Sequence, residues 1–248
     1  MTGTEARDSP PPAEPEADPL VSVVVAAYNE SATIAQVLRR VAELPLRTEI
    51  VVVDDGSIDD TRDVLDRLRR EELPDLRLEA HGKNRGKGAA LRTGIAAARG
   101  DVVVFQDADL EYDPADVPRL LAPIIAGHAD VVYGSRLRGG QPQRAHMFWH
   151  YAGNRLLTLL TNVLYNTTIS DMETGYKAFR GELIRSLPLI SEDFRIEPEV
   201  TARLLRRGGV RLYEIPISYY GRTYAEGKKI TWRDGLLAVG ALVRFRVD

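Results

Sequence analysis

The chain has 248 residues, of which 44% are hydrophobic and 28% charged, and its formal net charge is −3. This composition is typical of a soluble globular protein and gives no support for nucleic-acid binding. Cysteine is absent, which excludes disulfides and Cys-ligated zinc. We find no signal peptide and no run of about 20 apolar residues that could span a membrane, so we expect a cytoplasmic protein.

The two ends of the chain differ from its middle. Residues 1–19 are rich in proline and acidic side chains and have little to bury, which predicts a disordered tail. Residues 20–230 are predicted to form one domain. Residues 231–248 carry apolar side chains among arginines and are predicted to form a C-terminal amphipathic helix, which could pack onto the domain or lie on the cytoplasmic face of a membrane.

Buried β-branched runs alternate with segments of helical periodicity along the first half of the chain. The predicted strands are residues 20–27, 50–53, 76–80, 102–106 and 130–133, and the predicted helices are 34–41, 60–71, 89–99 and 114–126. This alternation predicts an α/β domain with a Rossmann-like, doubly wound, mostly parallel sheet and helices on both faces. In such sheets ligands bind beyond the carboxyl ends of the strands.

Polar side chains follow three of the predicted strands at that point. Tyr28-Asn29-Glu30 follows the first, the pair Asp54 and Asp55 the second, and Asp107-Ala108-Asp109 the fourth. Residues i and i+2 of an extended segment project to the same side, so Asp107 and Asp109 could face one point. Two carboxylates suit Mg²⁺ or Mn²⁺, with water and substrate phosphates as the other ligands. One such pair is commonly an ordinary acidic turn, but paired acids after two strands favour a site.

A basic, glycine-rich loop covers residues 82–88. Its spacing is one residue short of a P-loop, and Gly88 stands where a Ser or Thr would bind magnesium. It also lacks the third glycine of a dinucleotide-binding loop. Lys87 and its basic neighbours could still lend positive charge to a bound phosphate.

The pattern changes after residue 134. Residues 148–165 are predicted to form a helix that is apolar over more than half its circumference. Core packing is its ordinary explanation, and a surface for lipid or another subunit is the alternative. A further helix is predicted at 197–207 and a strand-like run at 211–220.

Seven short motifs resemble family 2 (GT-A fold) glycosyltransferases, and among them the dolichyl-phosphate mannose synthase-like branch. Each is weak alone, but together they cover about residues 20–230 in the right order. They are Val23–Glu30, Val53–Ser57, Asn84–Gly88, Gln106–Asp109, Gly134–Arg136, Glu173–Arg180 and the stretch from Arg222 to Lys229. The resemblance implies a GT-A fold with C-terminal helices on the acceptor side.

The resemblance also implies roles for individual residues. Tyr28, Glu30, Asp54 and Asp55 would hold the nucleotide base and ribose, with Ala26, Lys87 and Arg195 at the same nucleotide-sugar site. Asp107, Ala108 and Asp109 would lie at the diphosphate and metal, and Glu111 stands where the family often has a Gln near that metal. Arg136, Arg222 and Lys228 would bind phosphate groups of donor and acceptor.

The chemistry of the acceptor decides which residues must be catalytic. Metal at Asp107 and Asp109 would neutralise the departing diphosphate as a Lewis acid, with charge-assisted hydrogen bonds from Arg136. A hydroxyl acceptor also needs a general base, for which Asp193 is the best candidate. A phosphate acceptor is already anionic near neutral pH, because its second pKa is about 6. The predicted catalytic residues are therefore Asp109 and Arg136, together with Asp193 as the general base that a hydroxyl acceptor would need.

Our interpretation is an inverting enzyme that moves a hexose, mannose or glucose, from a GDP or UDP sugar to a polyprenyl phosphate. Two other interpretations stay open: the same fold with a saccharide or glycolipid hydroxyl as acceptor, and a nucleotide-sugar-binding module without turnover. Intact Asp107, Asp109 and Arg136 weigh against the second. We expect Mg²⁺ or Mn²⁺ as cofactor and a membrane surface or membrane protein as partner. A homodimer is left open.

Overall fold

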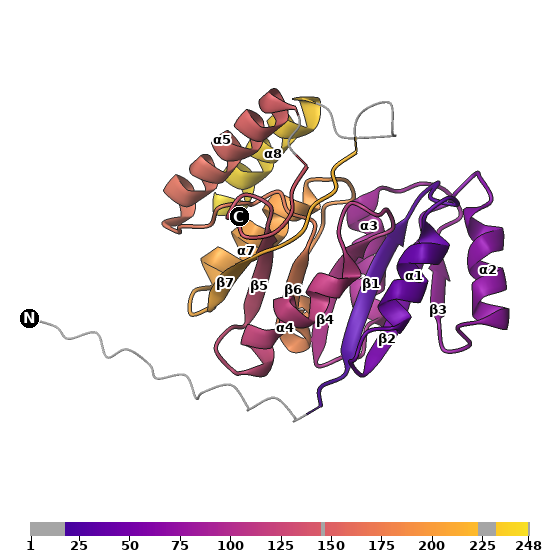
Figure 1. Cartoon of the computed structure of the whole chain (residues 1–248). Helices are drawn as coiled ribbons and strands as arrows, with labels where there is room; N and C mark the ends of the chain where they lie inside the picture. Colours follow the sequence, from indigo (N-terminus) through magenta and orange to yellow (C-terminus); the bar gives the residue numbers. More distant parts are fainter. Residues whose placement is uncertain (1–17, 145–146, 223–231, 248) are drawn as a thin grey trace, which may run out of the picture.

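The computed structural model of the chain describes residues 18–144, 147–222 and 232–247 (Figure 1). Most of the predicted tail and Lys228 lie outside the described residues. The predicted boundary at residues 230 and 231 does so as well, so the domain limits stay predictions.

The described residues form a seven-stranded sheet in the order β3-β2-β1-β4-β6-β5-β7. Its strands are β1 (Val21–Ala27), β2 (Thr48–Asp54), β3 (Arg77–Ala80), β4 (Val102–Asp107), β5 (Val131–Ser135), β6 (Lys177–Arg180) and β7 (Leu212–Pro216). Strand β6 is antiparallel to β4 and β5, and the other neighbours pair in parallel. The prediction of a mostly parallel sheet is therefore confirmed.

Helices cover both faces of this sheet, as the doubly wound prediction requires (Figure 1). One face packs against α1 (Ile34–Ala42), α2 (Thr61–Glu71) and α4 (Val117–Ile125), which follows the short 3₁₀ helix Pro114–Asp116. The other face packs against α3 (Lys87–Ala97), α6 (Gly181–Arg185) and α7 (Ile196–Arg207).

The central strands are apolar on both sides because both sides are buried. Val23 and Val25 of β1 face the first set of helices, whereas Val24 faces the second. All three are fully buried. A strand covered on both faces has a continuous apolar sequence rather than an alternating one. The short apolar runs in the sequence therefore predicted the central parallel strands correctly.

Two further helices, α5 (Phe148–Tyr165) and α8 (Trp232–Val247), lie side by side over α7 (Figure 1). Leu157 and Leu160 of α5 pack with the fully buried Leu242 of α8. Tyr165 donates a hydrogen bond of 2.7 Å to the carbonyl oxygen of Leu242. No helix in the described ranges is long and apolar enough to cross a bilayer.

Strand β6 was not predicted from the sequence. Its residue Lys177 is fully buried, and its ammonium group contacts Glu197 of α7 and donates to the carbonyl oxygen of Met172 at 3.1 Å. A charged residue in a four-residue central strand breaks the apolar pattern that marks the parallel strands. This strand brings the segment before it, residues 171–176, beside the end of β4.

Candidate active site

The loops that follow β1 and β2 are hydrogen-bonded to each other. Asn29 adopts a left-handed conformation with φ of 55°, which asparagine tolerates better than most residues. Its N–H donates to Ser57 Oγ at 3.0 Å, and its Oδ1 accepts from the Ile58 N–H at 2.9 Å. These bonds fix Tyr28 and Glu30, which flank Asn29 and line the main cavity.

The paired acids after β2 hold loops in place. Asp54 accepts a hydrogen bond from the Ser57 N–H at 3.0 Å. Asp55 accepts from the N–H groups of Arg85 and Gly86 at 3.0 and 2.7 Å, and it lies 2.6 Å from His81 Nδ1. Both aspartates are buried. Asp55 therefore closes the glycine-rich loop over the carboxyl end of the sheet.

That loop delivers Lys87 to the acidic end of β4. Lys87 is the first residue of α3, and its Nζ lies 2.8 Å from Asp107 Oδ1 and 3.4 Å from Glu197 Oε1. Burial acts to lower the pKa of Lys87, but the charges of Asp107 and Glu197 outweigh it and hold the pKa well above its usual value. The ammonium group therefore stays charged inside the site.

The second carboxylate of the β4 motif is crowded by other acids. Burial is the largest influence on Asp109, and with the charges of Asp107 and Glu111 it raises the pKa of this carboxyl to about 7. Arg222 opposes this shift, because its guanidinium contacts Asp109 and lies 3.4 Å from Glu30 Oε2. Crowded carboxylates of this kind attract a cation.

The hydrogen-bond partners of the acidic residues after β4 indicate which of them could hold a divalent cation. Asp107 and Asp109 both line the cavity and supply hard oxygen ligands. Glu111, predicted as a third ligand, accepts hydrogen bonds from the Tyr219 hydroxyl at 2.9 Å and the Arg222 N–H at 2.6 Å. In the part of the chain that the structure describes, no three His, Asp or Glu side chains are placed to hold a metal by themselves. The residues fit a metal held by two carboxylates and completed by substrate phosphates.

Arg136 is held rigidly at the side of the cavity. Its Nε and Nη2 each donate to the buried Asp171 at 2.8 Å, in a bidentate pair. Asn154 of α5 donates to the same carboxylate at 2.8 Å, and the guanidinium lies 5.1 Å from the centre of the Tyr219 ring. A cation fixed in this way can bind an anion without reorganising.

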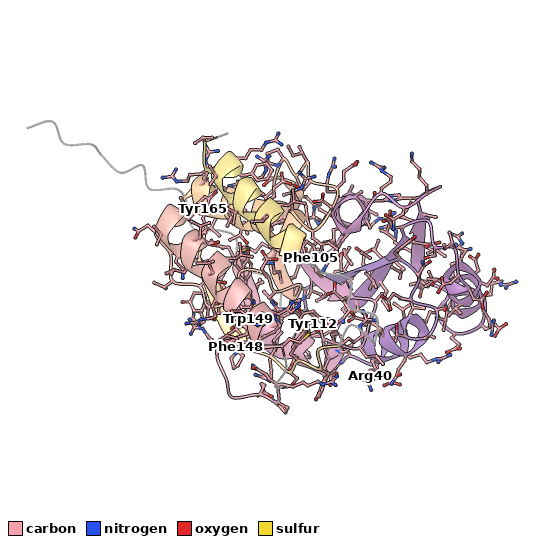
Figure 2. All side chains as sticks on the ribbon, turned by 90° about the horizontal axis from the view of Figure 1, so that it is seen from above. Arg40, Phe105, Tyr112, Phe148, Trp149 and Tyr165 are labelled. Atoms are coloured by element: carbon pink, nitrogen blue, oxygen red, sulfur yellow. The ribbon has the colours of Figure 1, made fainter. Side chains whose placement is uncertain are left out.

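These groups line one cavity of about 990 Å³, which has a polar and an apolar end. The apolar end is lined by α5 and α8, with Met147, Phe148, Trp149, Leu156, Leu157, Leu236, Ala238 and Val239. Figure 2 shows Phe148 and Trp149 at the end of α5 nearest Tyr112, and all three line the cavity. The cavity therefore joins the acidic strand ends to an apolar chamber.

Most of the predicted site residues meet in this cavity. Those that line it are Ala26, Tyr28, Glu30, Asp55, Lys87, Asp107, Ala108, Asp109, Glu111, Arg136 and Arg222. Asp54 lines a smaller neighbouring cavity with Tyr28. Asp193 and Arg195 do not line either cavity and instead pair with each other at 2.8 Å.

Three residues of the site were not predicted from the sequence: Glu173 and Glu197, which line the cavity, and Asp171, which holds Arg136. Glu173 is the first residue of the motif Glu173–Arg180, and nothing else in the sequence indicates that it belongs to the site. Glu197 was expected to begin a helix and carried no further signal. Their roles depend on long-range packing around β6.

Comparison with known proteins identifies the chain. Residues 22–187 match the family described as Glycosyl transferase family 2, and this match covers more than half of the sequence. The chain belongs to glycosyl transferase family 2. The predicted family is thereby confirmed, and so is the prediction of a glycosyltransferase.

Relatives of this glycosyltransferase occur in bacteria and archaea. An uncharacterized protein of Methanocaldococcus jannaschii is 30% identical over 79% of this chain and 80% of its own length. The undecaprenyl-phosphate 4-deoxy-4-formamido-L-arabinose transferase of Pseudomonas aeruginosa is 30% identical over 84% of this chain, which spans 60% of that protein. Glycosyltransferase AglD of Haloferax volcanii is 32% identical over 80% of this chain and 33% of its own length.

Solved structures confirm the predicted GT-A fold of this glycosyltransferase. Glucosyl-3-phosphoglycerate synthase of Mycobacterium tuberculosis superimposes with a TM-score of 0.71 at 23% identity, over 92% of this chain and 78% of that one. That structure holds Mn²⁺, UDP and phosphoglyceric acid. At this level of identity the likeness concerns the fold alone.

Proposed function

We propose that this glycosyltransferase moves a hexose, mannose or glucose, from a GDP or UDP sugar to a polyprenyl phosphate, with inversion at the anomeric carbon. The observation that carries the proposal is the single cavity that joins Asp107, Asp109 and Arg136 to the apolar chamber between α5 and α8. A nucleotide sugar suits the polar end, and the isoprenoid chain of a lipid suits the apolar end.

A divalent cation, Mg²⁺ or Mn²⁺, would be held by Asp107 and Asp109 and would supply Lewis-acid stabilisation of the departing diphosphate. Lys87 lies 2.8 Å from Asp107 and would add positive charge at the same place. Asp107 and Asp109 by themselves would repel the diphosphate, so the positive charge that binds it would come from the cation they hold and from Lys87.

The acceptor is assigned as a phosphate because the cavity offers a fixed cation and Asp193 is poorly placed as a base. Partial burial acts to raise the pKa of Asp193, but the hydrogen bonds and charge of Arg195 outweigh it, so the pKa lies below its usual value. Such a carboxylate takes up a proton less readily. Arg136 would instead hold the acceptor phosphate, whose oxygen needs no deprotonation.

The name of one relative supports a lipid-linked acceptor. The Pseudomonas aeruginosa protein is named for undecaprenyl phosphate, which has the chemistry proposed here for the acceptor. The exposed apolar side chains of α5 and α8 would bring the enzyme to the membrane surface where such lipids lie. We propose a peripheral association at the cytoplasmic face, through the membrane itself or a membrane-protein partner.

A donor panel tests this proposal. GDP-mannose, GDP-glucose, UDP-glucose and UDP-galactose would each be incubated with a short polyprenyl phosphate and Mg²⁺ or Mn²⁺, and the products read by mass spectrometry. We expect a hexosyl phosphopolyprenol from at least one donor, with an anomeric configuration opposite to that of the donor. No lipid-linked product from any donor, with retained donor hydrolysis, would contradict the assigned acceptor.

A further inference from the structure

Glu173, which lines the cavity, has a buried carboxylate oxygen, Oε1, without a hydrogen-bond partner among the described residues. Burial is the largest influence on this carboxyl and raises its pKa to about 7, although Lys177 acts in the opposite direction. Buried polar atoms are normally satisfied, so an unsatisfied one on a residue that lines a cavity points to a ligand.

The backbone on both sides of Glu173 is held firmly. The Met172 N–H donates to Thr158 Oγ1 at 3.1 Å, and the carbonyl oxygens of Met172 and Thr174 both accept from the Lys177 ammonium group. The Gly175 N–H donates to the Tyr112 hydroxyl at 3.0 Å. The fold therefore fixes the position of Glu173 while leaving its carboxylate unsatisfied.

The two ends of the segment 171–175 lie beside the proposed sites of the acceptor phosphate and of the donor diphosphate. Asp171, two residues before Glu173, holds Arg136, the proposed site of the acceptor phosphate. Gly175, two residues after it, lies so close to Asp107 that an added Cβ would stand 2.8 Å from Asp107 Oδ2. A sugar that passes from a diphosphate at Asp107 to a phosphate at Arg136 has to lie between them, and Glu173 lines the same cavity halfway along the segment that links the two sites.

The charge of Glu173 restricts what it can bind. A carboxylate repels the phosphate groups of donor and acceptor, and it accepts hydrogen bonds from neutral or positively charged donors. A hexose offers several hydroxyl donors, and bonds from a hydroxyl to a carboxylate are among the stronger ones. We propose that Glu173 recognises hydroxyl groups of the transferred sugar and so determines which sugar the enzyme accepts.

This inference rests on the proposed function, but binding tests it without the acceptor. Isothermal titration in the presence of Mn²⁺ would compare GDP-mannose with GDP and UDP-glucose with UDP, for wild type, Glu173→Ala and Glu173→Gln. The matched control is Glu192→Ala, which removes an exposed carboxylate that pairs with Arg85 at 2.9 Å outside the cavity. Thermal unfolding would show whether each variant is folded.

We expect Glu173→Ala to weaken the binding of the preferred nucleotide sugar by about 10-fold or more, the loss of a charge-assisted hydrogen bond, and to change the binding of the nucleoside diphosphate by less than about twofold. Glu173→Gln should lie between Glu173→Ala and wild type, and Glu192→Ala should match wild type. A deoxy analogue that lacks the hydroxyl recognised by Glu173 should bind wild type more weakly than the preferred donor does. The same analogue and the preferred donor should bind Glu173→Ala equally well.

Equal weakening of nucleotide sugar and nucleoside diphosphate in Glu173→Ala would overturn the inference, and so would unchanged binding of both. A Glu173→Gln variant that binds donor like wild type but loses turnover would also overturn it, because Glu173 would then act as a general base. Wild-type protein that bound none of the four nucleotides would overturn the proposed function and this inference together.

Discussion

At the residue scale, the carboxylate of Asp109 shares a confined space with Asp107 and Glu111. Without a compensating positive charge such crowding is unfavourable, and here Arg222 supplies it by contacting Asp109. The same arrangement makes Asp109 dispensable for folding, because removing one negative charge relieves repulsion. Function and stability should therefore respond in opposite ways to neutralisation of this residue.

We predict that Asp107→Asn and Asp109→Asn each lower turnover by roughly 100-fold, the scale of losing one preorganised electrostatic group. Thermal unfolding of Asp109→Asn should occur at the wild-type temperature or above it. The control is Asp113→Asn, which lies outside the cavity and keeps its capping hydrogen bond with the Ala115 N–H. Treatment with a chelator should reproduce the loss in the wild type, and undiminished transfer after such treatment would contradict the metal assignment.

A second residue-scale prediction separates phosphate from hydroxyl acceptors. Arg222→Ala should lower kcat/KM by about 10- to 150-fold, since it would remove a hydrogen bond from the guanidinium to a substrate phosphate, and a hydrogen bond to a charged group is worth roughly 1.5–3 kcal/mol. Asp193→Asn should cost far less, because its carboxylate is bound to Arg195 and lies outside the cavity lining. Lys228→Ala is expected to behave like Arg222→Ala.

The comparison of these variants would be read from steady-state kinetics with a polyprenyl phosphate acceptor. If Asp193→Asn abolished transfer while Arg222→Ala stayed near wild type, Asp193 would be acting as a general base. The acceptor would then be a hydroxyl, and the assignment of a lipid phosphate would be wrong.

Most of the site residues that could be predicted lie at or just after the ends of strands. Asp107 and Asp109 follow an apolar run directly, so their position at the sheet edge follows from the alternation of strand and helix. Glu173 could not be recognised in the same way, since its importance lies in a missing hydrogen bond and a buried position. Such properties arise only when β6 is inserted beside β4.

At the element scale, β6 depends on a buried charge. The Lys177 ammonium group contacts Glu197 and two carbonyl oxygens, and Glu197 lies 3.4 Å from Lys87. Lys177→Met should remove a charge that the surrounding acids need and lower the free energy of unfolding by about 3 kcal/mol, the low end for breaking a buried pair. Urea unfolding would measure this change.

The matched control for Lys177 is Arg69→Met, which breaks a surface contact with Asp66 at 3.3 Å. An exposed pair contributes at most about 1 kcal/mol, so this variant should unfold near the wild-type urea concentration. Equal effects of the two substitutions would show that the buried charge does not hold β6 in place.

Helix α5 presents an apolar surface that the domain does not cover. Phe148 and Trp149 are 67% and 81% exposed, and both also line the apolar end of the cavity. Side chains that are exposed and also border the apolar chamber are suited to the surface of a bilayer. Arg244 and Arg246 lie in the last turn of α8, beside the other end of α5, where Arg246 donates to the Leu164 carbonyl oxygen at 2.9 Å. A bilayer that lies along both helices would meet these charges, which favour anionic lipids.

We therefore predict weak, reversible binding to anionic phospholipid vesicles, measured by flotation at low salt. The double variant Phe148→Ser with Trp149→Ser should lose most of this binding. The control is Ile58→Ser, which replaces a side chain that is 86% exposed on the loop between β2 and α2. Absence of vesicle binding by the wild type would leave a membrane-protein partner or a soluble acceptor as the explanation.

At the scale of the whole molecule, the alternation of strands and helices could be predicted because most residues of the parallel strands β1, β2, β4 and β5 are buried and therefore apolar. The position of β6 was not readable, because a central antiparallel strand containing Lys177 has no apolar run to mark it. The helix predicted at 89–99 begins and ends two residues earlier, at Lys87 and Ala97, and this shift brings Lys87 onto the first turn beside Asp107.

The chamber itself could not be predicted, because it is assembled from segments far apart in the chain. Residues after β1, the loop before α3, the segment around Glu173 and the helices α5 and α8 all contribute to its lining. The sequence showed that residues 148–165 are apolar, but only the fold shows that their exposed end opens onto the acidic strand ends. Core packing was one explanation of this helix, and a surface for lipid or another subunit was the other; α5 has a packed side and an exposed apolar side.

The most direct test of the account compares two acceptors that differ only at their head group. A short polyprenyl phosphate and the corresponding polyprenol would be offered at equal concentration with the preferred nucleotide sugar and Mn²⁺, and the glycosylated lipid quantified by mass spectrometry. We predict transfer to the phosphate and at least about 100-fold less to the alcohol, because the guanidinium of Arg136 is a fixed positive charge in the cavity and the acceptor phosphate needs no base. Equal transfer to both lipids, or transfer to the alcohol alone, would contradict it.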